Sequence, residues 1–431
     1  MSLRVLHLTA HMGGGVGRVL SRVTAQAQRT TGWRHEIACL EKPEKTVFVT
    51  NARCGGVEVV VQPERQVVRR KIRDADIVLV HWWHHPAMAQ VLGNLHTLGP
   101  MRLAIWSHVS GLTTPCIEPG FVAAPHRFIF TSHCSLDNPL LSNLDPEWMA
   151  RQTAVVYSSG GFDDLICPPR QPREEFVVGY LGTLNPCKLH PEYLDFYAAA
   201  SAGPVRFETA GDLPPPAPSR TSAAMNALLS RIEHLGYVDD PAAALARFDV
   251  FGYLLNPQHY GTTENALLEA MALGVPPIVL DNPAERCLVE HGETGLVVRT
   301  PGEFAAAVEE LRRDSTLRRR LGNKARRTVR ERFAIERTAK DLHTALEPVA
   351  AEDPREFDLR EVFGAKPRDW FLSCLGQWRS VYLNANGARS RRPLPRILHE
   401  ASKGSVYQYH SYFPRDAGLR RWARLQMEGR L

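Results

Sequence analysis

Residues 260–277 read Tyr-Gly-Thr-Thr-Glu-Asn-Ala-Leu-Leu-Glu-Ala-Met-Ala-Leu-Gly-Val-Pro-Pro, and this stretch decides the fold. Thr263 can cap the start of a helix and Gly274 can end it, so we predict a helix between them. Glu264 lies in its first turn, and Glu269 is about 140° further round the helix axis. Glu269 stands among apolar residues, where an unpaired carboxylate is costly. We therefore expect it to have a specific partner, and the two hydroxyls of a ribose would supply two donors.

Outward from this helix, short apolar runs alternate with helical stretches, which is the βαβ rhythm of a parallel sheet. Most runs are rich in Val, Ile and Leu, as strands buried on both faces are. The predicted strands are 3–9, 35–40, 57–61, 76–82, 102–107, 127–131, 153–157, 176–181, 205–210, 233–238, 249–255 and 276–280. The predicted helices are Val16–Arg29, 191–200, 221–231, 241–247 and 263–273, with a charged helical region from Arg312 to Arg332.

A proline-rich stretch separates the two series of strands. Proline removes backbone donors and keeps the preceding residue extended, so Cys167–Arg173 is predicted to be a linker. The fold class is therefore α/β, with two Rossmann-like domains at 1–167 and 174–345. Residues 351–431 mix aromatic side chains with arginines, and aromatic side chains favour burial. We predict an ordered basic extension that packs back across the two domains.

The cysteines and the apolar runs indicate a location. The eight cysteines are scattered and form no Cys-x-x-Cys pair, as is typical of reduced thiols in a cytosol. Residues 3–9 are followed by glycines and fit a first strand better than a signal peptide. No apolar run approaches membrane-spanning length. The expected location is cytoplasmic.

The net charge of +6 lies in the extension. Residues 351–431 contain 15 Lys and Arg against 9 Asp and Glu, and the remaining chain has 37 of each sign. One interpretation is a solvated face. The other is attraction to anionic lipid or to an acidic acceptor, which would place the protein peripherally on the inner face of a membrane. No nucleic-acid partner is expected.

Two glycine loops follow predicted strands. Gly13, Gly14 and Gly15 precede a helix, where glycine permits close approach to a phosphate and the helix N-terminus attracts anions. The only acidic residue near the end of the second strand is Glu41, so the match to a dinucleotide fingerprint is loose and a nicotinamide dehydrogenase is disfavoured. The second loop ends at Lys188, which is well placed to neutralise a diphosphate. An ordinary surface lysine is the alternative.

These features together resemble family 4 of the retaining glycosyltransferases, the glycosyl transferases group 1. That family has the GT-B fold, in which the parallel sheets of two Rossmann-like domains face an interdomain cleft. Its motif has two glutamates eight residues apart, then Ala-Met-Ala, a glycine and a proline. Glu269, Ala270–Ala272, Gly274 and Pro276 match the second half of this motif. The resemblance covers roughly residues 1–345 and leaves the extension out.

The resemblance implies a set of site residues. Residues given a catalytic role are Lys188, which stabilises the diphosphate leaving group, His108, which touches the sugar from the N-terminal acceptor-side domain, and Glu264. Residues assigned to the donor nucleotide are Glu269 at the ribose, Tyr237 and Val238 beside the base, and Gly182 and Thr183 in the glycine loop. Residues assigned to the donor sugar and the phosphates are Gly14, Gly15, Arg18, Thr262, Thr263, Asn265 and Ala266. No cofactor and no metal ion are expected, because a lysine and helix N-termini can stabilise a departing nucleoside diphosphate.

The chain departs from the family pattern at two positions. Gly261 stands where the motif has its first glutamate, and Tyr180 stands where the family has an arginine. We expect Glu264, three residues after Gly261, to replace the missing carboxylate. Lys188 and Arg18 are expected to neutralise the diphosphate without the arginine.

Two short motifs resemble metal sites. Asp74-Ala75-Asp76 precedes a predicted strand and is interpreted as a turn. The cluster His81–His85 ends a strand with no carboxylate beside it, and we expect it to line the acceptor side.

The resemblance therefore predicts transfer of a hexose-type sugar from a nucleoside diphosphate such as UDP or GDP to a hydroxyl acceptor, with retention at the anomeric carbon. Synthesis of a glycan, a glycolipid or a glycosylated metabolite is the expected context, with polysaccharide biosynthesis as one case. Two alternatives stay open. One is a sugar-nucleotide epimerase on the same fold. The other is a non-catalytic protein that binds nucleotide sugars or glycans. The departures from the family pattern at Gly261 and Tyr180 suggest this hypothesis.

Overall fold

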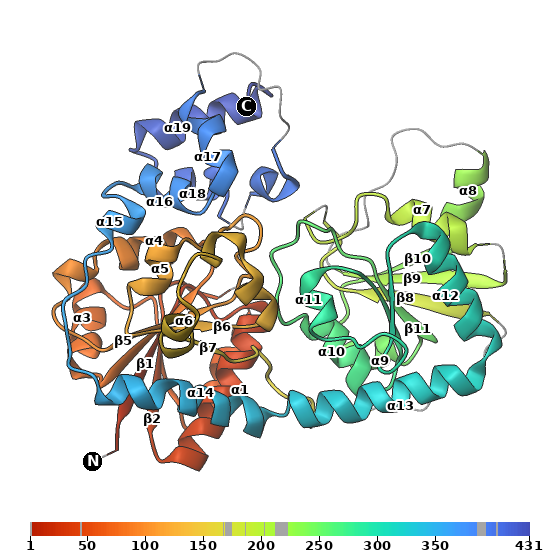
Figure 1. The fold of residues 1–431 in the computed structure, drawn as a ribbon, viewed down its shortest axis with the longest axis horizontal. Coiled ribbons are helices and arrows are strands. Elements are labelled where there is room, and N and C mark those ends of the chain that lie inside the picture. The colour runs from red at the N-terminus through yellow and green to blue at the C-terminus, as the bar shows by residue number, and fades with distance from the viewer. Residues whose placement is uncertain are drawn as a thin grey trace. The chain divides into compact units, whose positions relative to one another are not determined.

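The computed structural model describes residues 2–43, 45–166, 168, 175–185, 187–201, 203–211, 223–385, 394–401 and 404–431 (Figure 1). The chain forms two compact units, each described by itself below. The first contains Met1–Gly160, Tyr260–Thr262 and Ile335–Leu431, and the second contains Gly161–His259 and Thr263–Ala334. Of the predicted linker, only Pro168 lies among the described residues. The predicted domain limits 1–167, 174–345 and 351–431 stay predictions.

The first unit is built on a parallel sheet of seven strands in the order β3-β2-β1-β4-β5-β6-β7. The strands are β1 (Arg4–Thr9), β2 (Arg34–Cys39), β3 (Glu58–Val61), β4 (Ile77–Trp82), β5 (Leu103–Ser107), β6 (Arg127–Phe130) and β7 (Thr153–Val155). Its helices before residue 160 are α1 (Gly14–Thr31), α2 (Val47–Cys54), α3 (Arg65–Asp74), α4 (Pro86–Gly93), α5 (Pro119–Ala123) and α6 (Pro146–Gln152).

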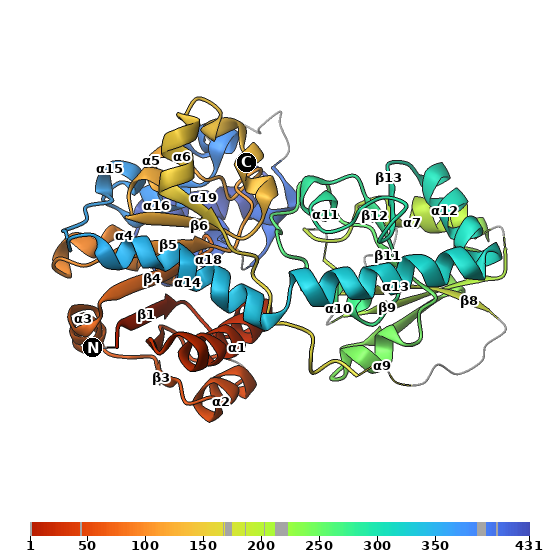
Figure 2. The same cartoon turned by 60° about the horizontal axis from the view of Figure 1, so that its bottom comes forward.

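One face of this sheet is covered by helices from both ends of the chain. Helix α14 (Ile335–Ala351) lies beside α1 (Figure 2). Val5, Leu79 and Trp106 from three strands share a buried core with Val19 of α1 and Leu346 of α14. This face of the sheet is therefore covered completely only with α14, which follows the second unit in the chain.

The C-terminal extension packs on the first unit through small helices. They are α15 (Arg360–Phe363), α16 (Pro367–Ser373), α17 (Arg379–Leu383), α18 (Val406–Tyr412) and α19 (Ala417–Met427). Phe363 lies 4.8 Å from Phe121 and 5.6 Å from Trp82 between ring centroids. The backbone N–H of Cys116 donates to the carbonyl of Cys374 at 2.8 Å. Aromatic side chains from the described part of the extension are thus buried against the first unit, while an ordered extension that packs across both domains stays a prediction.

The second unit has a six-stranded parallel sheet in the order β10-β9-β8-β11-β12-β13. The strands are β8 (Phe176–Leu181), β9 (Val205–Ala210), β10 (Ile232–Gly236), β11 (Val250–Tyr253), β12 (Pro277–Leu280) and β13 (Leu296–Val298). The helices are α7 (Tyr193–Ala200), α8 (Ala223–Leu229), α9 (Pro241–Leu245), α10 (Asn265–Ala272), α11 (Pro283–Arg286), α12 (Pro301–Arg313) and α13 (Ser315–Arg332). Gly179 lets β8 approach Phe248, because a Cβ there would come within 2.0 Å of its ring.

Two Rossmann-like parallel sheets are thus confirmed, and each of the twelve predicted strands overlaps an observed one. Strand β13 was not predicted. The charged region Arg312–Arg332 is mostly α13, whose buried side is Leu321, Gly322, Ala325 and Val329. Within the described ranges, no helix is both long enough and apolar enough to cross a membrane.

Candidate functional site

The loops after β8 and β11 are joined where these strands end. Leu189 and Leu255 form an isolated bridge, and the backbone N–H of Asn256 donates to the carbonyl of Lys188 at 2.7 Å. The N–H of His190 donates to the carbonyl of Leu254 at 2.9 Å. These contacts hold Lys188 beside the segment that follows β11, at the carboxyl edge where open α/β sheets bind ligands.

Lys188 and Glu264 form the central ion pair of the second unit. The Nζ atom of Lys188 donates to both carboxylate oxygens of Glu264, at 2.7 and 2.9 Å. The hydroxyl of Tyr253, the last residue of β11, donates to Oε2 of Glu264 at 2.7 Å. Glu264 precedes α10 as its N-cap, yet its side chain accepts no N–H of that helix. The carboxylate is instead committed to Lys188 and Tyr253.

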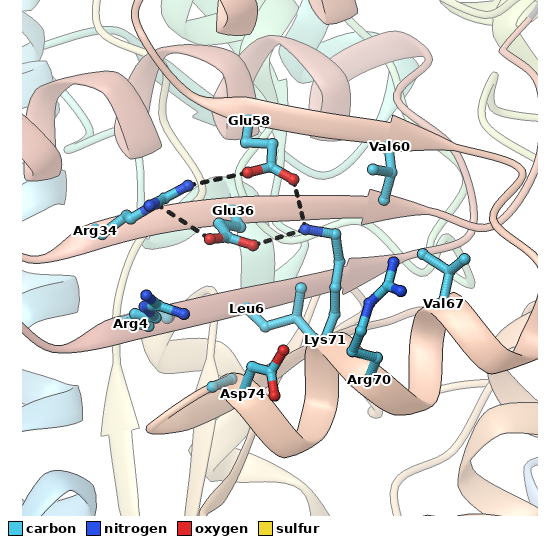
Figure 3. A pocket seen from close by; sticks show the side chains of 12 residues that line it. Arg4, Leu6, Arg34, Glu36, Glu58, Val60, Val67, Arg70, Lys71 and Asp74 are labelled. Atoms are coloured by element: carbon cyan, nitrogen blue, oxygen red, sulfur yellow. Dashed lines mark hydrogen bonds and ion pairs between the residues drawn. The ribbon is translucent and has the colours of Figure 1, made fainter.

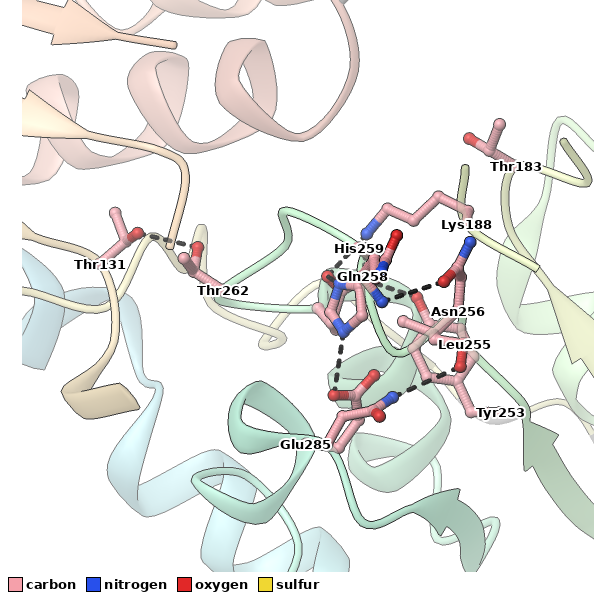
Figure 4. Close-up of polar contacts among 12 residues, drawn as sticks. Thr131, Thr183, Lys188, Tyr253, Leu255, Asn256, Gln258, His259, Thr262 and Glu285 are labelled. Carbon is pink, nitrogen blue, oxygen red and sulfur yellow. Dashed lines mark hydrogen bonds and ion pairs between the residues drawn. The ribbon is translucent and has the colours of Figure 1, made fainter. Parts of the chain in front are cut away.

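A histidine links this pair to a second carboxylate. His259 Nε2 lies 3.1 Å from Oε2 of Glu285, and His259 Nδ1 lies 3.7 Å from Oε1 of Glu264. Figure 4 shows His259 between Lys188 and Glu285. Glu285 is fully buried, and its Oε1 has no hydrogen-bond partner among the described residues. The site is therefore rich in carboxylates, and Lys188 is the cation that balances Glu264.

The ionisation of Glu264 follows from these contacts. Burial by itself raises the pKa of this carboxyl, but the charge of Lys188, helped by His259 and by hydrogen bonds from Lys188 and Tyr253, lowers it to about 2. Burial raises the pKa of Tyr253 well above its ordinary value, so its hydroxyl stays neutral. Near neutral pH Glu264 can accept hydrogen bonds from hydroxyls, but it has no proton to give.

Helix α10 carries further predicted residues. Asn265 and Ala266 form its first turn after Thr263 and Glu264, and Glu269 is buried in its middle, 7% exposed. The helix ends before Gly274, whose φ of +79° favours glycine. The predicted helix, the buried carboxylate and the terminating glycine are confirmed, but the residue at the N-cap is Glu264 and not Thr263, so Glu264 precedes the first turn. The role of Glu269 at a ribose stays a prediction.

The remaining predicted residues of the second unit lie after two different strands. Gly182 and the exposed Thr183 follow β8, while Tyr237 and Val238 follow β10, two strands away from β8 in the sheet. Tyr237 is 54% exposed, so its ring is accessible. Tyr180, the replacement for the family arginine, is buried and donates its hydroxyl to the carbonyl of Thr183 at 3.0 Å. It supports the glycine loop and supplies no charge.

The first unit places its predicted residues at the carboxyl edge of its own sheet. Gly14 and Gly15 start α1 after β1 and are exposed, and Arg18 lies near Gly160, where an added Cβ would come 3.3 Å from the Arg18 Cγ. Thr262 is buried and accepts a hydrogen bond of 2.8 Å from the hydroxyl of Thr131, as Figure 4 shows. Thr262, Thr263, Asn265 and Ala266 are assigned to the donor sugar by the resemblance. Thr262 belongs to the first unit, and the other three belong to the second.

His108 follows β5 and has both ring nitrogens engaged. Its Nε2 lies 2.9 Å from Nδ1 of His81, and its Nδ1 lies 3.2 Å from the hydroxyl of Ser158. Burial lowers the pKa of His108 to about 3, so the ring is neutral at physiological pH.

Sequence reasoning did not identify Tyr253, His259 or Glu285. Each follows or ends a strand at the carboxyl edge of the second sheet, where ligand sites of open α/β folds lie. Tyr253 lies inside the predicted strand 249–255, and Glu285 lies five residues beyond the predicted strand 276–280, so neither stands out in the sequence. His259 lies six residues beyond β11 and carries no local signal either.

A cavity of about 330 Å³ lies at the opposite, amino edge of the first sheet (Figure 3). Four of its charged side chains pair with one another, since Arg34 and Lys71 each bridge Glu36 and Glu58 at 2.6–3.1 Å. Asp74 also lines it, and Asp76 accepts the N–H of Arg4 at 2.8 Å. The Asp-x-Asp motif therefore connects the end of α3 to β4 at this edge. We interpret the cavity as a structural charge network.

Over the described ranges, no group of three or more His, Cys, Asp or Glu residues is arranged to hold a metal ion. The expectation of a metal-free reaction stays a prediction.

Comparisons with known proteins support the resemblance over the second unit. Residues 175–314 match the family model described as Glycosyl transferases group 1. N-acetyl-alpha-D-glucosaminyl L-malate synthase of Bacillus anthracis is 32% identical over 126 residues, 28% of this chain and 32% of that protein. The capsular polysaccharide biosynthesis glycosyltransferase CapM of Staphylococcus aureus is 28% identical over 170 residues, 37% of this chain and 43% of that protein. The matches span between 21% and 43% of the curated relatives' lengths.

Solved structures confirm the fold over most of the chain. A glycosyltransferase of Rickettsia africae superposes with a TM-score of 0.62 at 14% identity, covering 80% of this chain and 98% of that one. Anabaena Alr3699/HepE in complex with UDP and glucose gives 0.61 at 16% identity, covering 80% and 100%. The predicted GT-B fold is confirmed.

Proposed function

We propose that this protein is a glycosyltransferase that moves a sugar from a nucleoside diphosphate to a hydroxyl acceptor with retention, and that it needs no metal ion. The observation that carries the proposal is the pair Lys188–Glu264 at the carboxyl edge of the second sheet, beside the N-terminus of α10. It lies within the residues that match the family model. Proteins similar in sequence take part in lipopolysaccharide core and capsular polysaccharide biosynthesis, which favours a glycan acceptor.

The chemistry follows from the charges at this pair. A departing nucleoside diphosphate gains negative charge, which the Lys188 ammonium and the first N–H groups of α10 stabilise. Glu264 is ionised and cannot act as an acid, so we assign it to orienting Lys188 and to accepting hydrogen bonds from sugar hydroxyls. The leaving phosphate oxygen then accepts the proton of the acceptor hydroxyl on the face where the new bond forms.

The other assignments rest on the family resemblance. Glu269 would bind the ribose, Tyr237 and Val238 the base, and Gly14, Gly15 and Arg18 the phosphate and acceptor side. UDP is the first nucleotide to test, because the similar fold of HepE was solved with UDP and glucose.

Thermal unfolding with a panel of nucleotides tests the donor site. A ligand at a hundred times its Kd stabilises the folded state by about 2.7 kcal/mol, which raises the Tm of a unit of this size by roughly 5 °C. We expect UDP or GDP to raise the Tm by this amount. The sugar nucleotide with the same base should be consumed when an acceptor is present, and EDTA should not stop the reaction. If no nucleotide changes the Tm, the donor site is wrongly assigned. A product with inverted anomeric configuration, or turnover that EDTA abolishes, would contradict the mechanism. Conversion of the donor without an acceptor would indicate an epimerase. Nucleotide binding without turnover would indicate a non-catalytic protein.

We also propose that the extension contacts an anionic membrane surface, on the cytoplasmic side. Arg415, Arg420 and Arg424 are exposed on or beside α19, and Met427 near them is 71% exposed. Basic side chains near an anionic bilayer contribute about 1 kcal/mol each.

Sedimentation with vesicles tests this contact. We expect binding to vesicles containing phosphatidylserine at 0.1 M salt, little binding to phosphatidylcholine alone, and loss of binding in R420E/R424E. Equal binding by the wild type and R420E/R424E would overturn the proposal. Binding of a soluble polyanion without any binding to vesicles would assign the patch to an acidic acceptor.

A further inference from the structure

Four histidines form a continuous hydrogen-bonded row across the first sheet. His35 lies on β2, His7 on β1, His81 on β4, and His108 directly after β5. Each neighbouring pair is joined by ring nitrogens 2.9 Å apart: His35 Nδ1 to His7 Nε2, His7 Nδ1 to His81 Nε2, and His81 Nδ1 to His108 Nε2. The hydroxyl of Ser158, 3.2 Å from His108 Nδ1, ends the row.

Sheet register explains the geometry of the row. His35 is level with Val5, two residues before His7 on β1, and His81 is level with Trp106, two residues before His108. Each step therefore crosses to the next strand and moves two residues toward its carboxyl end. A period of two keeps side chains on the same face of a sheet. The row thus runs diagonally over one face, from inside the sheet to its ligand-binding edge.

Burial makes the row electrically neutral. His7 and His81 are fully buried and His35 is 3% exposed. Burial lowers the pKa of all four rings, in His35 to about 4 and in His108 to about 3. A neutral imidazole has one N–H and one lone pair, so adjacent rings must point head to tail. The four rings consequently share one tautomeric state.

The inner end of the row selects that state. Nε2 of His35 is buried and has no hydrogen-bond partner among the described residues. A buried N–H without an acceptor is rarer in proteins than a buried acceptor without a donor. His35 therefore carries its proton on Nδ1 and donates to His7. Every ring then has its proton on Nδ1, and His108 donates to the Ser158 oxygen.

We propose that His35, His7 and His81 are positioning residues that hold His108 in its Nδ1–H tautomer, so that Ser158 accepts from His108 and directs its own proton to substrate oxygens. Both nitrogens of His108 are occupied in the row, so the sugar or phosphate contact predicted for His108 belongs to Ser158. The role in turnover rests on the proposed function, whereas the tautomer order does not.

The tautomer order is tested first, on the wild-type protein. Protein labelled with ¹⁵N-histidine is examined by NMR at pH 7.5, and each signal is assigned by its loss in a single variant. We expect His7, His35, His81 and His108 all to be protonated on Nδ1. Protonation of His108 on Nε2 overturns the proposal, and so does a mixture of tautomers within the row. This measurement needs no substrate, so it stands even if the sugar-transfer assignment fails.

Turnover variants test the positioning role. S158A and H81F are each expected to lower kcat about tenfold, the effect of losing one hydrogen bond, with a smaller change in KM. His81→Asn can still donate to His108 Nε2 and should restore both the Nδ1–H signal and most of the rate. The matched control is His126→Phe, since His126 precedes β6 at the amino edge and stays outside the row. Equal rates for H81F and H126F would overturn the role, and if H81F does not fold, S158A and H81N decide it.

Discussion

Replacing Lys188 with methionine is expected to lower kcat/KM at least a hundredfold. Lys188 donates hydrogen bonds to both carboxylate oxygens of Glu264. We assign it to stabilising the diphosphate leaving group. Removing one preorganised group of this kind from a developing negative charge costs a factor of about 100–1,000 in rate. Initial rates with the nucleotide sugar identified by thermal unfolding measure the effect.

The same substitution also affects stability, and a double variant separates the two effects. Lys188→Met leaves Glu264 buried, 5% exposed, with its charge uncompensated, which costs about 3 kcal/mol. Glu264→Gln removes that charge, so K188M/E264Q should recover most of the free energy of unfolding. It should not recover the rate. Lys324→Ala, an exposed lysine of α13 in the same unit, is the matched control and should keep both.

Two results would contradict this assignment. Full activity in K188M would show that Lys188 does not contact the leaving group. A double variant that regains activity together with stability would show that the loss in K188M reflected only the buried, unpaired Glu264.

The fold was largely predictable because its signal is local. Most of the buried parallel strands are short apolar runs rich in Val, Ile and Leu, and the limits predicted for Phe176–Leu181 and Val205–Ala210 agree with the structure. Strand β13, Leu296–Val298, was not predicted. The return of α14 to the first unit has no local signal, because it depends on which apolar face is left uncovered.

The candidate site was predictable residue by residue but not as an arrangement. Lys188 and Glu264 were each singled out, yet they are 76 positions apart, and their pairing depends on the bridge between the two loops. Glu264 is predicted to replace the carboxylate that is missing at Gly261. In the structure Glu264 lies at this edge and accepts hydrogen bonds from Lys188 and Tyr253. His81 and His108 were singled out in the sequence, but the row was not, because it takes a single residue from each strand.

Five buried histidines predict that the first unit loses stability steeply as pH falls from 7 to 5. They are the four rings of the row and His84, whose pKa burial lowers to about 4. In the unfolded chain each titrates near 6.5, so below that pH the unfolded state binds more protons than the folded state, and stability falls toward the folded pKa values. Each contributes about 2 kcal/mol between pH 7 and pH 5, and together they contribute roughly 9 kcal/mol, comparable to the whole stability of a domain.

Tryptophan fluorescence reports this loss selectively, because all eight tryptophans lie in the segments of the first unit. Urea unfolding followed by this signal at pH 7, 6 and 5 gives the free energy of unfolding at each pH. His84→Gln should reduce the dependence on pH by about one fifth, because it removes one of five equivalent protonations. Stability that stays constant from pH 7 to pH 5 would mean that these rings become protonated inside the folded unit. The head-to-tail order of neutral imidazoles would then be lost at pH 5, because a ring with two N–H groups cannot accept from its neighbour.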